Sequence, residues 1–113
     1  MLFIEGTEII VLRGEEGIIG FMIIRLIKDQ AEIITVAIDR KERNKGFGKF
    51  LLRKSIENIK DKGGAIIFLE VAESDEAALN LYKSSGFEVI GKRNNYYTRA
   101  EKMVDAINMR LVL

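Results

Sequence analysis

The stretch that decides the fold is ITVAIDRKERNKGFG, residues 34–48. It begins as a β-branched run typical of a strand and continues into a turn with two glycines and extra basic charge. Glycine lets the backbone approach an anion closely, and the first amides of a helix point free N–H groups at it. We therefore expect a strand, a turn and a helix that bind a phosphorylated ligand. A solvated strand-to-helix connection is the alternative that this stretch alone leaves open.

Upstream of this stretch, apolar runs separated by polar turns predict a meander of three antiparallel strands. The hairpin signal is GEEG at residues 14–17. Paired isoleucines at 23–24 and 33–34 interrupt strict alternation, as expected of strands that are buried on both faces or locally bulged. The three runs cover residues 8–13, 18–27 and 31–38.

Downstream, small and apolar residues recur every three or four positions from Gly48 to Ile59, which predicts a helix. Lys62-Gly63-Gly64 is a typical end for that helix. An apolar run at residues 65–71 follows. A strand, a helix and a strand in this order imply a right-handed crossover, with residues 33–38 parallel to residues 65–71.

The remaining segment predicts one more helix and two more strands. Ser74 is a plausible N-cap for a helix at about residues 75–85. Strands at 87–92 and 104–111 would be joined by a polar, aromatic loop at 93–103. The expected order is therefore βββαβαββ, an α/β (α+β) fold with a mixed central sheet, in a single domain of residues 1–113.

The composition excludes several classes of protein. The chain has no cysteine and no histidine, so thiolate nucleophiles, Cys-based zinc sites and Ser-His triads are impossible. A net charge of +1 does not resemble a nucleic-acid binder, and no apolar run reaches transmembrane length. We expect a cytoplasmic protein without nucleic-acid or membrane partners, whose acid–base chemistry uses Asp, Glu, Tyr or Lys.

Four groups of residues could carry chemistry. The turn at 43–48 lacks the third glycine of a dinucleotide site and the Gly-Lys-Ser/Thr of a nucleotide P-loop. Glu70, within an apolar strand, is either a general base or a solvated strand end. Tyr82 is either core or a proton donor at a cleft, and Tyr96-Tyr97 either pack on the surface or line a ligand groove.

Linked motifs in this order resemble the GNAT superfamily of acyl-CoA-dependent N-acyltransferases. RNKGFG at residues 43–48 is similar to its R/Q-x-x-G-x-G/A signature, and LYKSSGF at residues 81–87 is similar to its L-Y-x-x-x-G-F helix motif. LEV at 69–71, RNNYY at 93–97 and DAINM at 105–109 resemble the ribosomal-protein-alanine N-acetyltransferases within that superfamily.

The resemblance implies a role for each matching residue. Glu70 would be the general base, acting through water, and Tyr82 the acid that protonates the departing thiolate. Tyr96 and Tyr97 would lie beside the acceptor peptide. Acetyl-CoA would be the co-substrate, without a metal, and a protein N-terminal alanine the acceptor. The coenzyme A contacts would come from Val36, Ala37, Ile38, Arg43, Asn44, Lys45, Gly46, Phe47, Gly48, Lys49 and Asp75.

Two departures from the family pattern qualify these expectations. Asp75 stands where the family usually has asparagine, which removes a donor near coenzyme A and adds negative charge. Met1 leads almost directly into the first hairpin, where the family usually has a strand and two helices that help to bind the acceptor. An N-terminally shortened domain leaves two rivals open, namely a non-catalytic acyl-CoA-binding module and an acetyltransferase for lysine or small-molecule amines. It also predicts exposed apolar sheet surface and self-association as a dimer.

Overall fold

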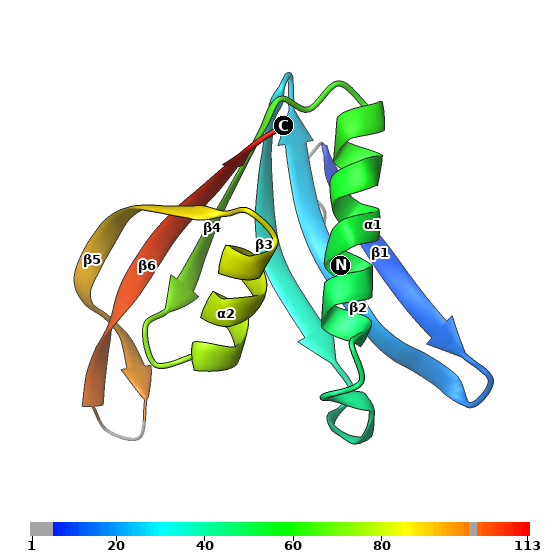
Figure 1. The fold of residues 1–113 in the computed structure, drawn as a ribbon, viewed down its shortest axis with the longest axis horizontal. Helices are drawn as coiled ribbons and strands as arrows, with labels where there is room; N and C mark the ends of the chain where they lie inside the picture. Colours follow the sequence, from blue (N-terminus) through cyan, green and yellow to red (C-terminus); the bar gives the residue numbers. More distant parts are fainter. Residues whose placement is uncertain (1–5, 100–101) are drawn as a thin grey trace.

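The computed structural model describes residues 6–99 and 102–113. Its elements follow the order βββαβαββ, as predicted, with one short 3-10 helix just before the glycine turn (Figure 1). The strands are β1 (Thr7–Gly14), β2 (Gly17–Ile27), β3 (Gln30–Ile38), β4 (Ile66–Ala72), β5 (Glu88–Arg99) and β6 (Lys102–Val112). The helices are η1 (Arg40–Glu42), α1 (Phe47–Asp61) and α2 (Glu76–Ser84).

The six strands form one mixed sheet in the order β1-β2-β3-β4-β6-β5. Strands β3 and β4 run parallel, which confirms the predicted crossover, but their pairing covers residues 30–33 with 66–69. The predicted pairing of residues 33–38 with 65–71 is therefore wrong in register. Beyond Ile33 the two strands diverge, and Figure 1 shows the sheet opening like a V at this point.

A bulge accompanies this divergence. The register between β2 and β3 shifts between Ile23 and Ile24, whose partners are Thr35 and Ile33. This confirms the bulge as the reason for the interrupted alternation in the sequence. A bulge bends a strand and increases its local twist. The distal half of β3 thus stays paired with β2 while its other edge opens.

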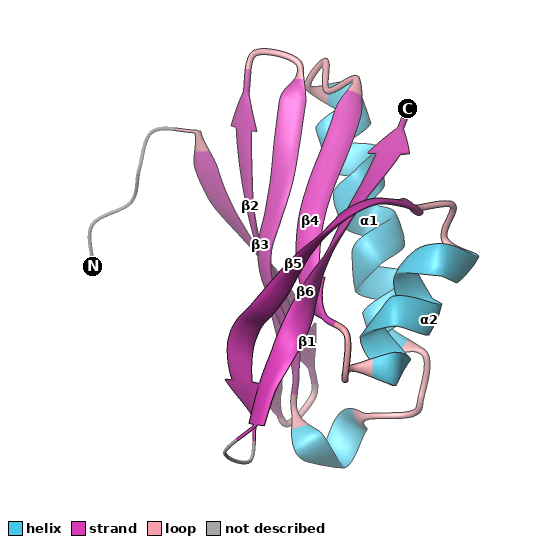
Figure 2. Cartoon of the chain, turned by 90° about the vertical axis from the view of Figure 1, so that its left-hand side faces the viewer, coloured by secondary structure: helices cyan, strands magenta, loops and turns pink. Residues whose placement is uncertain are grey.

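Both helices cover one face of the sheet (Figure 2). On α1, the buried side chains include Leu51, Leu52 and Ile59, and each leucine contributes about 1.5–3 kcal/mol of burial free energy. Ser55 is buried beside them because its hydroxyl donates a hydrogen bond to the Leu51 carbonyl over 2.8 Å. The opposite face of the sheet carries exposed apolar side chains, among them Ile9.

Two local predictions are corrected by the structure. Asp75, and not Ser74, is the N-cap of α2, because its carboxylate accepts a hydrogen bond from the Ala78 amide over 3.1 Å. Residues 93–103 do not form a loop: β5 continues to Arg99 and β6 begins at Lys102. A register shift between Arg93 and Tyr97 breaks the alternation that would have marked this segment as strand.

Within the described ranges, no helix is long and apolar enough to cross a membrane.

Candidate functional site at the split between β3 and β4

The divergence of β3 and β4 opens a cleft of about 220 Å³. Thr35 and Val36 line it from β3, Glu70 lines it from β4, and Asp75 and Tyr82 line it from α2. The structure therefore brings together the proposed base, the proposed acid and part of the expected coenzyme A contact. Larger hollows exist elsewhere, but this cleft is where the acid–base candidates meet.

The glycine turn begins α1 without a polar cap. Gly46 is the N-cap with φ of 85°, a left-handed conformation that glycine adopts without strain. No side chain bonds the helix start, and the first turn of α1 contains no acidic residue. The first amides of α1 therefore remain available to an anion, which the helix dipole also favours.

Gly48 has no evident role in the fold itself. A Cβ at this position would meet only the Leu81 side chain at 3.6 Å, an ordinary contact. Glycine inside a helix costs about 0.5–1 kcal/mol relative to alanine. A residue that weakens its helix without a packing reason fits a place where a ligand approaches the backbone closely. The turn therefore fits a phosphate-bearing cofactor.

The side chains of the turn differ in how they are placed. Arg43 donates from Nε to the Ile38 carbonyl over 3.1 Å, which ties the turn to the end of β3. Lys45 forms an exposed ion pair with Glu42 at 3.3 Å. Lys49 is exposed on the first turn of α1. These cations border the open amides, so the N-terminal start of α1 is electropositive.

The open edge of β3 offers backbone groups to the cleft. Asp39 donates its amide to the Ile19 carbonyl over 2.7 Å, so this residue faces β2. Backbone groups alternate in direction along a strand, which directs those of Val36 and Ile38 to the other edge. Ala37 then faces β2, where its register partner is Phe21. Of the three predicted β3 contacts, Val36 and Ile38 thus have the suitable orientation.

Glu70 lies near the end of β4, opposite Asn108 on β6. Its side chain is 21% exposed, so the prediction that it is a fully solvated strand end does not hold. One carboxylate oxygen, Oε2, is buried and has no hydrogen-bond partner among the described residues. The Arg93 Nε atom lies 3.0 Å from that oxygen, which is close enough for an ion pair.

Tyr82 is both a core residue and a wall of the cleft. It is 4% exposed, and its ring packs edge-on against Phe87 with 5.6 Å between the ring centres. Burial, and secondly the negative charge of Asp75, raise the pKa of Tyr82 to about 12. The phenol therefore keeps its proton throughout the physiological range.

The sequence alone predicted no role for Arg93, although this residue belongs to the RNNYY segment. It lies on β5 opposite Ala106, and its guanidinium lies 4.6 Å from the ring centre of Tyr96. The opposite charges of Arg93 and Glu70 were the one signal in the sequence for a contact between them. The two residues come together because β6 pairs with both β4 and β5. The backbone of Tyr97 pairs with Val104, and its side chain lies outside the described part.

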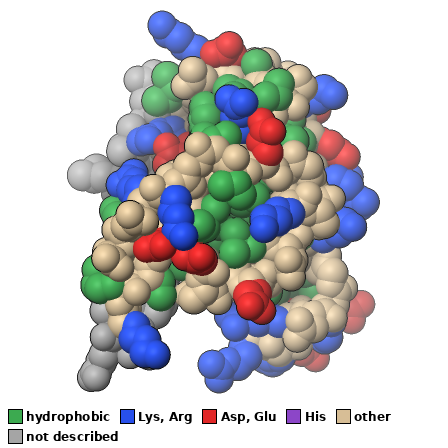
Figure 3. All heavy atoms as spheres, turned by 60° about the vertical axis from the view of Figure 1, so that its left-hand side comes forward, with side chains coloured by type: hydrophobic (Ala, Val, Ile, Leu, Met, Phe, Trp, Pro, Cys, Tyr) green, Lys and Arg blue, Asp and Glu red, His purple; other side chains and the backbone are tan. Residues whose placement is uncertain are grey.

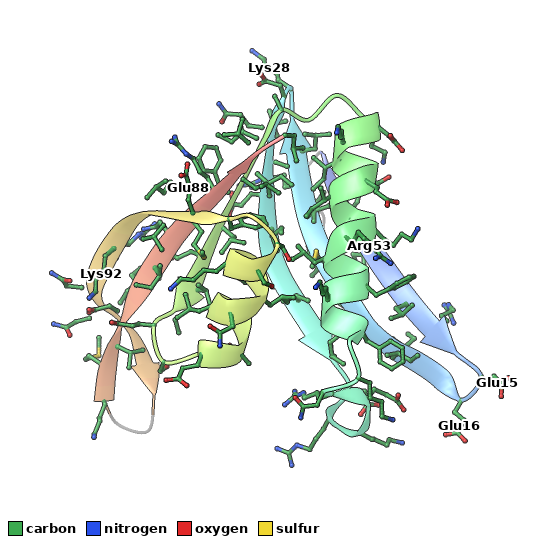
Figure 4. All side chains as sticks on the ribbon, in the orientation of Figure 1. Glu15, Glu16, Lys28, Arg53, Glu88 and Lys92 are labelled. Carbon is green, nitrogen blue, oxygen red and sulfur yellow. The ribbon has the colours of Figure 1, made fainter. Side chains whose placement is uncertain are left out.

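The neighbouring Lys92 has a different environment. Its Nζ lies 3.1 Å from an Asp105 carboxylate oxygen and 3.5 Å from a Glu73 oxygen. Asp105 also accepts the Asn95 amide over 2.7 Å, and this hydrogen bond is the main reason that its pKa is lowered. Lys92, labelled on β5 in Figure 4, therefore joins the β5–β6 hairpin to the start of the α2 connection.

Comparison with known proteins defines the class. Residues 3–87 match the Acetyltransferase (GNAT) family, and the chain belongs to that family. In particular, it is 34% identical over 100 residues to the [ribosomal protein bS18]-alanine N-acetyltransferase of Salmonella typhimurium, a match that covers 88% of this chain and 68% of the relative. Several other curated relatives of that name are matched over 56–62% of their length.

Solved structures agree with this assignment. The crystal structure of the ribosomal-protein-S18-alanine N-acetyltransferase from Escherichia coli superposes with a TM-score of 0.92 at 32% identity, over 96% of this chain and 70% of that one. A GNAT family acetyltransferase from Elizabethkingia anophelis with acetyl-CoA bound has a TM-score of 0.86 at 23% identity, over 96% and 77%. The second likeness supports the fold alone.

Proposed function

We propose that this chain is a cytoplasmic N-acetyltransferase that transfers acetyl from acetyl-CoA to a protein N-terminal amine, the N-terminal alanine of a ribosomal protein. The observation that carries this proposal is the shared cleft of Glu70 and Tyr82 beside an uncapped helix start. A carboxylate and a protonated phenol on one cleft are the pair that an acyl transfer to an amine needs. The names of the relatives supply the acceptor.

Acetyl-CoA would supply the acetyl group as a thioester. The residues from Arg43 to Lys49 would bind its pyrophosphate, through the amides of α1 and the space left at Gly48. Val36 and Ile38 would bond the rest of the molecule through the open edge of β3. A backbone N–H at this edge would also stabilise the oxyanion of the tetrahedral intermediate.

Glu70 would remove the proton from the acceptor amine, directly or through a water molecule. An α-amino group has a pKa of about 7.7–8.0, so a carboxylate base is sufficient when a good fraction of the amine is already neutral near pH 8. The half-buried position of Glu70 supports this role because a base must contact the reacting amine while being shielded from bulk water.

Tyr82 would donate its proton toward the sulfur that leaves. A thiol has a pKa of about 8.5, so full transfer from a phenol near 12 is uphill by about 5 kcal/mol. We therefore assign Tyr82 the donation of a hydrogen bond to the sulfur in the tetrahedral intermediate. The proton would move to the sulfur only as the intermediate collapses and the carbon–sulfur bond breaks. Its hydroxyl must face the cleft for this, as its position in the cavity wall supports.

The acceptor peptide would bind beside two tyrosines of the same domain. Residues 1–113 would act as one unit, with Tyr96 and Tyr97 beside the acceptor peptide. Tyr96 is 49% exposed, which suits contact with a peptide. A non-catalytic acyl-CoA-binding module is the competing function, because the glycine turn alone would serve to bind the cofactor.

The test is acetyl transfer to a peptide that begins with alanine, followed by mass spectrometry. Tyr82→Phe keeps the ring on Phe87 and removes the hydroxyl, and we expect it to lower the rate by about a hundredfold or more, in the range typical of general acid catalysis. Ser84→Ala is the matched control, since it removes an exposed hydroxyl from the same helix. Acetyl-CoA binding without transfer to peptides, lysine or polyamines would favour the binding module.

A further inference from the structure

Arg93 and Glu70 form an ion pair in which one partner is largely buried and the other is exposed. The Glu70 oxygen in the pair is buried and has no hydrogen-bond partner in the described part of the chain. A buried carboxylate oxygen without a cation is costly. The Arg93 side chain is 57% exposed, so water can solvate it when it leaves the pair. The carboxylate needs a cation, but the arginine does not need this carboxylate.

The strand geometry gives Arg93 a second contact outside the pair. The register between β5 and β6 shifts between Arg93 and Tyr97, and Asn95 has a φ of 53° within that irregular segment. This bulge places the exposed Tyr96 ring under the guanidinium at 4.6 Å. A cation above an aromatic face gains about 0.5–1 kcal/mol at an exposed site. Tyr96 can therefore retain the guanidinium after it separates from Glu70.

Lys92 shows what a structural ion pair looks like on the same strand. It contacts two carboxylates, Glu73 and Asp105, and these contacts raise its pKa, with the hydrogen bond to Asp105 as the largest cause. Arg93 has one carboxylate partner among the described residues, and its hydrogen-bond geometry to that partner is poor. Lys92 is therefore held by two carboxylates, whereas the contact of Arg93 with Glu70 is one that another cation can replace.

We infer that Arg93 occupies the position of the acceptor's ammonium group beside Glu70, and that a cationic amine displaces it on binding. This inference rests on the proposed function, since it names the acceptor side of the same cleft. An α-ammonium group is smaller than a guanidinium and can donate hydrogen bonds to the buried oxygen. Arg93 thus acts as a specificity-determining residue: only an amine that outcompetes a resident cation gains access to Glu70.

The test compares two peptides that differ in one group. Binding of an alanine-starting peptide and of its N-acetylated form is measured by calorimetry on the full chain, without acetyl-CoA. Arg93→Met removes the charge but keeps an unbranched stem, and we expect it to bind the free-amine peptide about fivefold more tightly, because the ion pair between Arg93 and Glu70 no longer has to be broken. The acetylated peptide should bind both proteins equally.

Two further variants keep the result interpretable. Arg93→Lys retains the charge without the planar fork, and we expect an affinity between those of the wild type and Arg93→Met. Lys92→Met removes the adjacent cation, which pairs with Glu73 and Asp105, and should leave the affinity for each of the two peptides as it is in the wild type. In steady-state kinetics, Arg93→Met should lower the KM for the peptide more than it changes kcat.

The outcomes separate this inference from the proposed function. Equal affinity of wild type and Arg93→Met for the free-amine peptide, or no binding by either protein, overturns the role of Arg93. Selective tightening in Arg93→Met without any acetyl transfer supports the role of Arg93 and overturns the enzymatic proposal. Equal tightening for both peptides shows that Arg93 blocks the groove sterically, which also overturns the inference.

Discussion

Asp75 and Tyr82 are coupled across α2, because the carboxylate that caps the start of the helix also raises the pKa of the tyrosine. Burial is the larger cause and the charge of Asp75 the smaller one. The capping residue thus links helix stability to the acidity of the proposed proton donor. In this chain the link is electrostatic, since Asp75 acts on Tyr82 through its negative charge.

Replacing Asp75 by asparagine is expected to change acidity without destabilising α2. Asparagine and aspartate are about equally good N-caps, so the melting temperature should change little. The pKa of Tyr82 should fall below about 12 but stay above its ordinary value, because burial remains. Ultraviolet titration of tyrosinate measures this directly, and Tyr82→Phe identifies which of the three tyrosines is responsible. Acetyl-CoA should bind Asp75→Asn more tightly, since a negative charge near the cofactor is gone.

The pH dependence of the reaction follows from the raised pKa of Tyr82. Below about pH 12 the phenol is protonated, so the proton donor is present over the whole accessible range. The rate should rise as the acceptor amine loses its proton near pH 8 and should then stay level. Rates measured from pH 6 to about pH 10.5 test this expectation. A loss of activity centred near pH 9–10 that Tyr82→Phe abolishes would contradict it.

The order of the elements could be predicted because local signals mark it. The GEEG turn produces the first hairpin, and Lys62 followed by Gly63, with φ of 89°, ends α1 where the sequence indicates. Charged residues and glycines at such positions affect only the conformation of the neighbouring backbone, so their effect can be predicted without knowing the rest of the fold. The N-cap of α2 was misplaced by one residue, because Ser74 and Asp75 are both good caps and only the backbone conformation distinguishes them.

Features that depend on pairing between distant strands could not be predicted in detail. Glu70 and Arg93 are brought together by β6, which pairs with both of their strands. The opening of β3 from β4 depends on a bulge, and the sequence indicated the bulge but not its effect on the parallel register. The irregular segment from Arg93 to Tyr97 resembled a loop because strand alternation is lost there.

Gly46 and Gly48 are expected to respond differently to alanine. Gly48→Ala should keep or raise the melting temperature, since the new Cβ meets only Leu81 and the helix gains about 0.5–1 kcal/mol, but it should weaken acetyl-CoA binding. Gly46→Ala should lose stability of about 1 kcal/mol because its φ is 85°.

Gly63→Ala is the matched control for that strain, since Gly63 has a similar φ of 89° and open space around it. It should lose stability like Gly46→Ala and bind acetyl-CoA normally. Calorimetry and thermal unfolding measure both properties on each variant. If Gly48→Ala binds acetyl-CoA as well as the wild type does, the turn is only a strand-to-helix connection.

The uncovered face of the sheet is expected to mediate self-association. Ile9 and Val11 project from β1 on the side away from the helices, and Ile34 adds to them on β3, each 41–45% exposed. Hydrophobic side chains bordered by charged ones also gather over the side of the molecule where β5, β6 and α2 lie (Figure 3). Large apolar patches on a soluble chain mark interaction surfaces. We therefore expect a dimer by light scattering at micromolar concentration.

Ile9→Glu should shift this equilibrium to monomer, because burying an unpaired carboxylate in an apolar interface costs more than the interface gains there. Val89→Glu is the matched control: Val89 is 51% exposed, but its register partner is the core residue Met109, so it lies on the helix-covered face. That variant should remain dimeric if the uncovered face is the interface. A monomeric wild type contradicts self-association, and dissociation by Val89→Glu but not by Ile9→Glu places the interface on the other face.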